Sequence, residues 1–118
     1  MITTHSIILY IVATIFGITG FVKLKLSLKN LAKMLPWTRE FKPSTIRFLG
    51  FYELLGAILL AGPSIIKAAF YLTSYSAIGL SLVMILAGIY HSRKKQYSSL
   101  VINALLLVAL LSIAFNFL

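Results

Sequence analysis

Residues 46–62 read IRFLGFYELLGAILLAG, and this run decides the fold. Its only charged residues are Arg47, at its start, and Glu53, near its middle. As a helix rising about 1.5 Å per residue it reaches roughly 25 Å, which spans a thin bilayer. A single carboxylate inside such a run is costly in lipid and usually faces the interior of a helical bundle. The run therefore predicts a transmembrane helix with one polar inner face.

Three further apolar runs occupy residues 6–22, 68–90 and 98–118. The chain is 60% hydrophobic and 11% charged, with a mean hydropathy of +1.00, whereas a soluble domain is nearer half apolar and a quarter charged. A soluble fold of 118 residues cannot bury so much apolar surface. The sequence predicts a single integral membrane domain over residues 1–118, an all-α bundle of four transmembrane helices.

Basic residues are concentrated in two of the three connections. Residues 23–47 hold seven Lys or Arg and residues 93–95 hold three, whereas the connection between the second and third runs holds only Lys67. The positive-inside rule then places the first and third loops in the cytoplasm and both termini outside. Gly62-Pro63 predicts a tight exit from the second helix, and Ser44 is a candidate cap at its start.

The first loop carries an amphipathic helical pattern over about residues 24–35. Leu24, Leu28, Leu31 and Leu35 fall on one side, and three lysines fall on the other. This pattern predicts a basic amphipathic helix lying on the cytoplasmic surface of the membrane; a docking helix for a partner protein is the alternative. We expect contacts with lipid, including anionic lipid, from Lys25, Lys29, Lys33, Trp37, Arg93, Lys94 and Lys95. Because the basic residues lie between apolar runs, we expect the net charge of +9 to serve topology and lipid contact, and we expect no nucleic-acid partner.

Glu53 is expected to have polar neighbours at its own depth. In the predicted topology Lys23 ends the first helix, His91 ends the third, and Asn103 lies just inside the fourth. All of these positions lie toward the cytoplasmic leaflet. We therefore predict an inward-facing polar cluster of Lys23, Glu53, His91 and Asn103.

Two interpretations of this cluster stay open. Glu53 could pair with Lys23 or Arg47 and fix the register of the helices. Alternatively, Glu53 could accept a proton or bind a polar ligand, with His91 exchanging protons near neutral pH. The residue types are compatible with either role.

Several kinds of redox or metal chemistry are not predicted for the single chain. The sequence has no cysteine, which excludes thiolate nucleophiles and cysteine-ligated iron–sulfur clusters. His5 and His91 are predicted at opposite ends of the bundle, so they cannot hold one haem between them. Glu53 and His91 are fewer ligands than a closed zinc site needs. We expect no metal and no cofactor in the single chain.

Three segments of the sequence resemble the DoxX-like family of small four-helix bacterial membrane proteins. They are Gly20-Phe21-Val22-Lys23-Leu24, then Arg47 to Ala57 followed by Gly62-Pro63, and lastly Ala87-Gly88-Ile89-Tyr90-His91. The likeness covers nearly the whole chain, and its most distinctive part is Gly-x-x-Glu-Leu-x-Gly-Ala. The long basic first loop departs from the family pattern and leaves the choice of partner open.

The resemblance implies a location in the bacterial cytoplasmic (inner) membrane and a wider group that includes subunits of quinone-linked redox complexes. It also implies that Lys23, Glu53 and His91 are the family's characteristic polar positions. Our first hypothesis is an auxiliary subunit that is not catalytic on its own, with any quinone bound through the complex. The alternative is a small proton-coupled carrier or exporter acting as an oligomer. A protein partner or a second copy is expected in either case.

Overall fold

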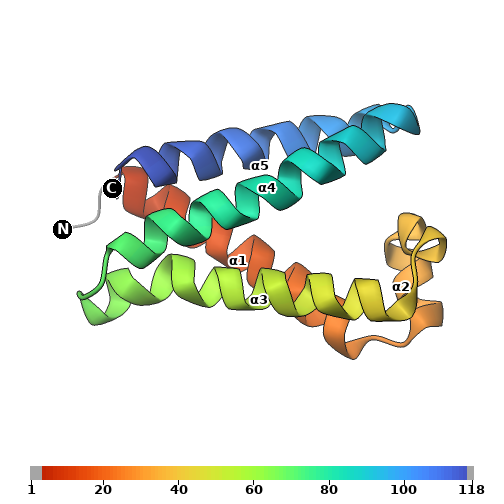
Figure 1. Cartoon of the computed structure of the whole chain (residues 1–118), viewed down its shortest axis with the longest axis horizontal. Helices are drawn as coiled ribbons and strands as arrows, with labels where there is room; N and C mark the ends of the chain where they lie inside the picture. Colours follow the sequence, from red (N-terminus) through yellow and green to blue (C-terminus); the bar gives the residue numbers. More distant parts are fainter. Residues whose placement is uncertain (1–3, 117–118) are drawn as a thin grey trace.

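The computed structural model describes residues 4–116, apart from the side chains of residues 4, 5, 36 and 37, and Figure 1 shows its helices. Four long helices are α1 (Thr4–Lys25), α3 (Pro43–Ile66), α4 (Tyr71–Arg93) and α5 (Tyr97–Asn116). Two short elements, α2 (Leu28–Met34) and the 3-10 helix η1 (Pro36–Glu40), connect α1 to α3. Each long helix is apolar and long enough to cross a membrane. The predicted all-α bundle of four membrane helices is confirmed.

The start of α3 lies three residues before the predicted position. The helix begins at Pro43 rather than at residue 46, and its N-cap is Lys42 rather than Ser44. Proline suits the first helical position because its φ is already helical and its missing N–H would have no partner there. Proline chemistry therefore sets this boundary, and the hydroxyl of Ser44 does not.

The end of α3 also differs from the predicted exit at Gly62-Pro63. The helix continues through Pro63 to Ile66, and Lys67 ends it in the left-handed conformation with a φ of 56°. The carbonyl of Pro63 accepts hydrogen bonds from the N–H groups of Lys67 and Ala68. The helix therefore ends four residues after the proline, through bonds to a backbone carbonyl. Residues 67–70 connect α3 to α4. Ala69, within this connection, is also left-handed, with a φ of 54°.

The other boundaries shift by a few residues. The expected helices over 68–90 and 98–118 correspond to α4 and α5, with residues 117–118 outside the described range. α1 extends three residues beyond the predicted end at residue 22, to Lys25. Apolar runs therefore locate the membrane segments, whereas the helices continue into the polar flanks.

The four long helices pack as two hairpins. α1 packs along α3, α4 packs along α5, and α3 joins the hairpins through α4. Figure 1 shows the hairpins close together at the end that holds both chain termini and farther apart at the opposite end. The first loop and the α4–α5 turn both lie at this opposite end, which we call the basic end because Lys25, Lys29, Lys33, Arg39, Lys42, Arg93, Lys94 and Lys95 are exposed there.

The core lies between the helices toward the end with the chain termini. Its most buried large side chains include Leu9, Phe16, Leu60, Leu80 and Leu110. Hydroxyl groups link the helices to one another across this core. Thr73 donates to the carbonyl of Leu60, and Ser74 donates to the carbonyl of Ala114, each at 3.0 Å. Such bonds between helices are typical of membrane bundles, where water cannot satisfy the polar groups.

The first loop does not form one helix over residues 24–35. Residues 24 and 25 belong to α1, and α2 begins after Ser27, whose hydroxyl oxygen accepts a hydrogen bond from the Asn30 N–H at 3.3 Å. Serine competes with the helical backbone in this way and favours a helix start. Within α2, Leu31 is buried and Lys29 and Lys33 are exposed. The location of this segment on the membrane surface stays a prediction, and the side chain of Trp37 lies outside the described part of the chain.

Contacts across the basic end connect the two hairpins. The carboxylate of Glu40 forms an ion pair with the Lys94 ammonium, with Nζ and Oε1 3.0 Å apart. The rings of Phe41 and Tyr90 lie 5.5 Å apart between centroids. The first loop therefore contacts the α4 helix where the hairpins have diverged.

Candidate functional site

The polar centre of the bundle is an ion pair between α1 and α3. Lys23 Nζ donates to Glu53 Oε1 at 2.6 Å, and Thr19 Oγ1 donates to Glu53 Oε2 at 3.1 Å. Lys23 is 7% exposed and Glu53 is 2% exposed. Each carboxylate oxygen therefore has a hydrogen-bond donor from α1. A buried charge of this kind is tolerated only when it is paired and hydrogen-bonded.

Two glycines bring the backbones of α1 and α3 close enough for this pair. A Cβ atom added at Gly20 would lie 2.7 Å from the Gly50 carbonyl oxygen. A Cβ atom added at Gly50 would lie 2.8 Å from the Gly20 carbonyl oxygen and from Lys23 Cβ. Neither distance leaves room for a methyl group. Contacts between small residues of this kind allow membrane helices to approach closely.

The direction of the side chains explains why Lys23 reaches Glu53. Each charged residue lies three positions after its glycine, Gly20 or Gly50, and the two helices run in opposite directions. Helical side chains lean toward the N-terminus of their own helix. In an antiparallel pair, the side chains of Lys23 and Glu53 therefore lean toward each other across the glycine contact.

Arg47 occupies a different position from the one proposed for it as a partner of Glu53. Its Nη1 donates to the backbone carbonyl of Lys23. Carbonyls in the last turn of a helix lack intrahelical donors. A cation there also interacts favourably with the negative end of the helix dipole. Arg47 therefore stabilises the end of α1, while Lys23 is the residue that pairs with Glu53.

The other two members of the predicted cluster form bonds elsewhere. His91 Nδ1 lies 2.7 Å from Gln96 Oε1 in the α4–α5 turn. Asn103 is buried, and its Nδ2 donates to the Met84 carbonyl at 2.6 Å, which joins α5 to α4. Both residues belong to the α4–α5 hairpin, which diverges from α1 and α3 toward the basic end (Figure 1). The structure brings Lys23 and Glu53 together, whereas the described bonds of His91 and Asn103 lie within their own hairpin.

Thr19 is the site residue that the predicted cluster lacked. It lies four positions before Lys23, so both side chains occupy one face of α1. Its hydroxyl also lies 3.2 Å from the Phe16 carbonyl, so its single proton is shared between that carbonyl and Glu53. The four-residue spacing was the available signal, but threonines in apolar helices commonly bond their own backbone.

The arrangement determines what this site can do chemically. The ammonium and the carboxylate neutralise each other, and two donors on α1 and both carboxylate oxygens on α3 are used in holding the pair. Among the described residues there is no group of three or more His, Cys, Asp or Glu side chains that could hold a metal ion. The pair can therefore fix the register of α1 against α3, and breaking it would leave a buried charge.

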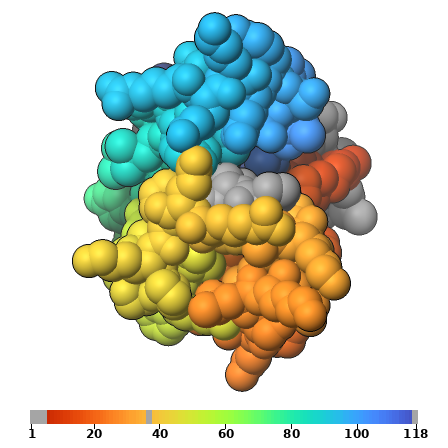
Figure 2. All heavy atoms as spheres, turned by 90° about the vertical axis from the view of Figure 1, so that its right-hand side faces the viewer, coloured from red at the N-terminus to blue at the C-terminus, as the bar shows by residue number. Residues whose placement is uncertain are grey.

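The basic end forms a second polar surface. Figure 2 views the molecule from this end, with the first loop below and the start of α5 above. The described members of the predicted lipid-contacting set, from Lys25 to Lys95, are all exposed. Lys94 is the member bound by Glu40.

Comparison with known proteins identifies one family. The sequence model of the DoxX-like family matches residues 7–114. The matched range includes both residues of the ion pair and the whole basic end. Searches of curated proteins and of solved structures found no match.

Proposed function

Since the chain belongs to the DoxX-like family and is a small multi-pass membrane protein, we propose that it is an auxiliary subunit of a quinone-linked membrane redox complex. In this role the chain does not catalyse a reaction on its own. It supplies a stable bundle against which other subunits pack, and any quinone is bound through the complex.

One observation carries the structural part of this proposal. Glu53 is 2% exposed, and both of its oxygens already accept hydrogen bonds from α1. A carboxylate that reacts with a substrate must reach that substrate within hydrogen-bond distance. The position of Glu53 favours a role in holding α1 against α3 over a role in chemistry.

The outer surface of the bundle supports a subunit role. In each long helix, only 22% to 33% of the most apolar stretch of 18 residues is buried inside the bundle. Large side chains such as Phe48, Phe51 and Phe115 are exposed on the helices. Within a bilayer this surface is available to lipid or to the helices of another subunit, which would associate through close packing.

Copurification tests this proposal. The tagged chain would be expressed in its own host, extracted in mild detergent and analysed by native mass spectrometry. We expect the wild type to carry subunits of a quinone-linked complex and Glu53→Gln to lose them, because the bundle surface changes when α1 and α3 separate. Glu40→Gln is the matched control, since it removes an exposed carboxylate from a similar pair. A wild-type chain without partners, together with unchanged quinone-linked activity in membranes that lack it, would refute the proposal.

A proton-coupled carrier formed by an oligomer is the second candidate. The observation that favours this candidate is that Glu53 and Lys23 are ionisable groups buried within membrane segments. Proton relays in membrane proteins are built from such groups. The test is a flux measurement in liposomes that contain the purified protein. Vesicles that stay impermeable to protons and solutes would remove this candidate.

We also propose that the chain lies in the bacterial cytoplasmic membrane with its basic end in the cytoplasm. The charge distribution supports this orientation, because ten of the eleven Lys and Arg residues lie in the first and third connections and only Lys67 lies in the second.

A further inference from the structure

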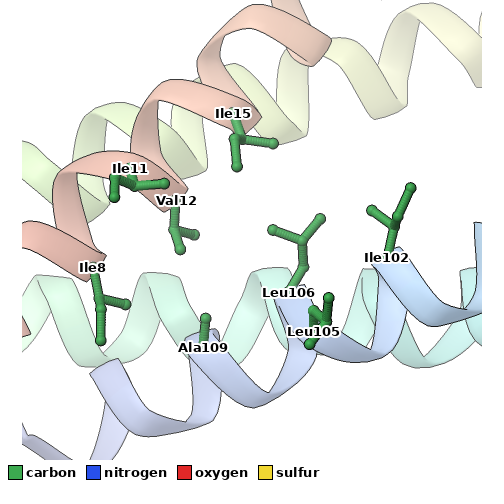
Figure 3. Close-up of a pocket in the computed structure, with 8 residues that line it drawn as sticks. All are labelled: Ile8, Ile11, Val12, Ile15, Ile102, Leu105, Leu106 and Ala109. Carbon is green, nitrogen blue, oxygen red and sulfur yellow. The ribbon is translucent and has the colours of Figure 1, made fainter.

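An apolar groove runs between α1 and α5 on the outside of the bundle. Its volume is about 350 Å³. Figure 3 shows the side chains of its two walls facing each other, and the two helices diverging toward Ile15 and Ile102. The lining residues are Ile8, Ile11, Val12, Ile15, Ile102, Leu105, Leu106 and Ala109.

The groove needs an apolar occupant. Side chains that face an empty space lose their van der Waals partners on that side. The walls carry aliphatic side chains, and several of them, including Ile11 and Leu105, are more than half exposed. In a bilayer the neighbouring molecules at this position are lipids, so we expect a lipid acyl chain to occupy the groove.

The groove extends from the leaflet at the basic end to beyond the middle of the bilayer. Along α5 from Tyr97, Ile102 lies about 8 Å and Ala109 about 18 Å into the helix, at about 1.5 Å per residue. Along α1 from Lys25, Ile15 lies about 15 Å and Ile8 about 26 Å deep, at about 1.5 Å per residue. Half of a hydrocarbon core is about 15 Å thick. Acyl chains that start at the basic end therefore reach the near end of the groove, at Ile15 and Ile102.

Exposed basic side chains lie on both sides of the end face at which the headgroup of such a lipid would lie. α1 ends at Lys25, and α2 contains Lys29 and Lys33. α5 begins at Tyr97, two residues after Lys95. All four lysine side chains are exposed. Figure 2 shows the two segments that carry them on either side of the same end face. An anionic headgroup is the complementary partner, since each basic residue near a membrane surface attracts anionic lipid.

We propose that this chain has a specific site for one anionic phospholipid, with an acyl chain in the α1–α5 groove and the headgroup among the lysines of the basic end. The site joins two features that are separate in the sequence, the aliphatic faces of α1 and α5 and the lysines that flank them. It is independent of the redox role proposed above.

The headgroup part of the site is tested by lipid titration. The full chain would be delipidated in detergent and titrated with phosphatidylglycerol or phosphatidylcholine of identical acyl composition, and bound lipid would be counted by native mass spectrometry. We expect the first bound phosphatidylglycerol to be retained at least about tenfold more strongly than phosphatidylcholine. Replacing Lys25, Lys29 and Lys33 with Gln should weaken it by roughly fivefold per lysine, and should leave phosphatidylcholine unchanged.

The groove part of the site is tested with paired variants of α5. Ala109→Phe fills the groove and should lose the retained lipid, whereas Ala104→Phe adds the same group at an exposed position that does not line the groove. Because Ala109 is partly buried, a second pair avoids dependence on its folding. Leu105→Ala removes part of the groove wall and should weaken retention, whereas Leu111→Ala, also exposed, should not.

Each outcome decides one part of the proposal. Equal retention of the two headgroups in the wild type would overturn the anionic site and leave only an adventitious apolar contact. Equal retention in Leu105→Ala and Leu111→Ala would overturn the groove as the binding position. Preference for phosphatidylglycerol combined with loss in the groove variants is the result that supports the site.

Discussion

At the scale of single residues, Glu53 is a carboxylate inside an apolar helix, and its position depends on donors from another helix. Lys23 and Thr19 supply these donors at 2.6 and 3.1 Å. Removing one member of a buried pair is costly because the other charge remains without compensation. Removing both members leaves no such charge, so the pair should show strong energetic coupling.

The first prediction follows from this coupling. Glu53→Gln and Lys23→Gln should each lower the free energy of unfolding in detergent by about 3 kcal/mol. The double substitution should lower it by clearly less than the sum of the two, with a coupling of about 1 to 3 kcal/mol. Denaturant titration followed by circular dichroism measures all four proteins.

An exposed pair in the same chain provides the control. Glu40 and Lys94 are 3.0 Å apart, with side chains that are 45% and 48% exposed. Glu40→Gln should cost less than about 1 kcal/mol, because water screens an exposed pair. Additive effects of the Lys23 and Glu53 substitutions would show that the buried pair does not hold the helices together.

The ion pair could be predicted from the sequence because its geometry is local to two neighbouring helices. A lysine at the end of one helix and the acid in the next lie at similar depth in any antiparallel hairpin. The choice between Lys23 and Arg47 could not be predicted, since both cations lie toward the same end of the bundle as Glu53. Only the three-dimensional structure shows that Arg47 bonds a backbone carbonyl at the end of α1.

At the scale of helices, the contact of α1 with α3 depends on two residues without side chains. Our second prediction is that Gly20→Ala lowers the free energy of unfolding by about 1 to 3 kcal/mol, because the added methyl overlaps the backbone of α3. Thermal or denaturant unfolding in detergent measures this effect.

Gly62→Ala is the matched control on α3. No neighbouring atom lies within 4 Å of the Cβ position there, and alanine favours the helix by up to about 1 kcal/mol. This substitution should be neutral or stabilising. If Gly20→Ala were equally well tolerated, the close approach of the helices at Gly20 and Gly50 would be contradicted.

The end of α3 gives the third prediction. Lys67 has a φ of 56°, a conformation that costs a residue with a side chain about 1 kcal/mol and suits glycine. Lys67→Gly should therefore raise the free energy of unfolding by roughly that amount. Lys42→Gly, at the other end of α3 with a φ of −63°, should bring no such gain. A loss of stability in Lys67→Gly would contradict the left-handed helix end.

Helix ends were the part of each element that the sequence predicted least well. Apolar runs indicate which residues must lie in lipid, but the backbone stays helical beyond them until a specific group stops it. At the start of α3 this group is Pro43, and at its end it is the left-handed Lys67 rather than Pro63. A proline near the end of a helix removes only one donor, so its presence alone did not decide the boundary.

At the scale of the whole molecule, the divergence of the two hairpins could not be predicted. Depth along the membrane normal placed Lys23, Glu53, His91 and Asn103 at similar levels, but depth contains no information on lateral distance. The packing of side chains between α3 and α4 sets that distance, and the bonds of His91 and Asn103 lie within the α4–α5 hairpin. The same divergence opens the groove between α1 and α5 (Figure 3).

The orientation of the molecule in the membrane gives the last prediction. The chain contains no cysteine, so single cysteines can be introduced at exposed positions without any background. Asn30→Cys marks the first loop, Ser92→Cys marks the end of α4, and Ala68→Cys marks the connection between α3 and α4. Basic loops stay in the cytoplasm. A maleimide that cannot cross the cytoplasmic membrane should therefore label Ala68→Cys in cells whose outer membrane has been permeabilised. The other two should be labelled only in inverted vesicles.

The pattern of labelling distinguishes the fold from its orientation. Labelling of Asn30→Cys and Ala68→Cys from the same side would contradict a membrane crossing by α3, the helix that carries Glu53. Complete reversal of the pattern would retain the four crossings but place the basic end outside, where the lysines would face the outer leaflet. Because the proposed headgroup site moves with the basic end, the same experiment also determines which leaflet supplies its lipid.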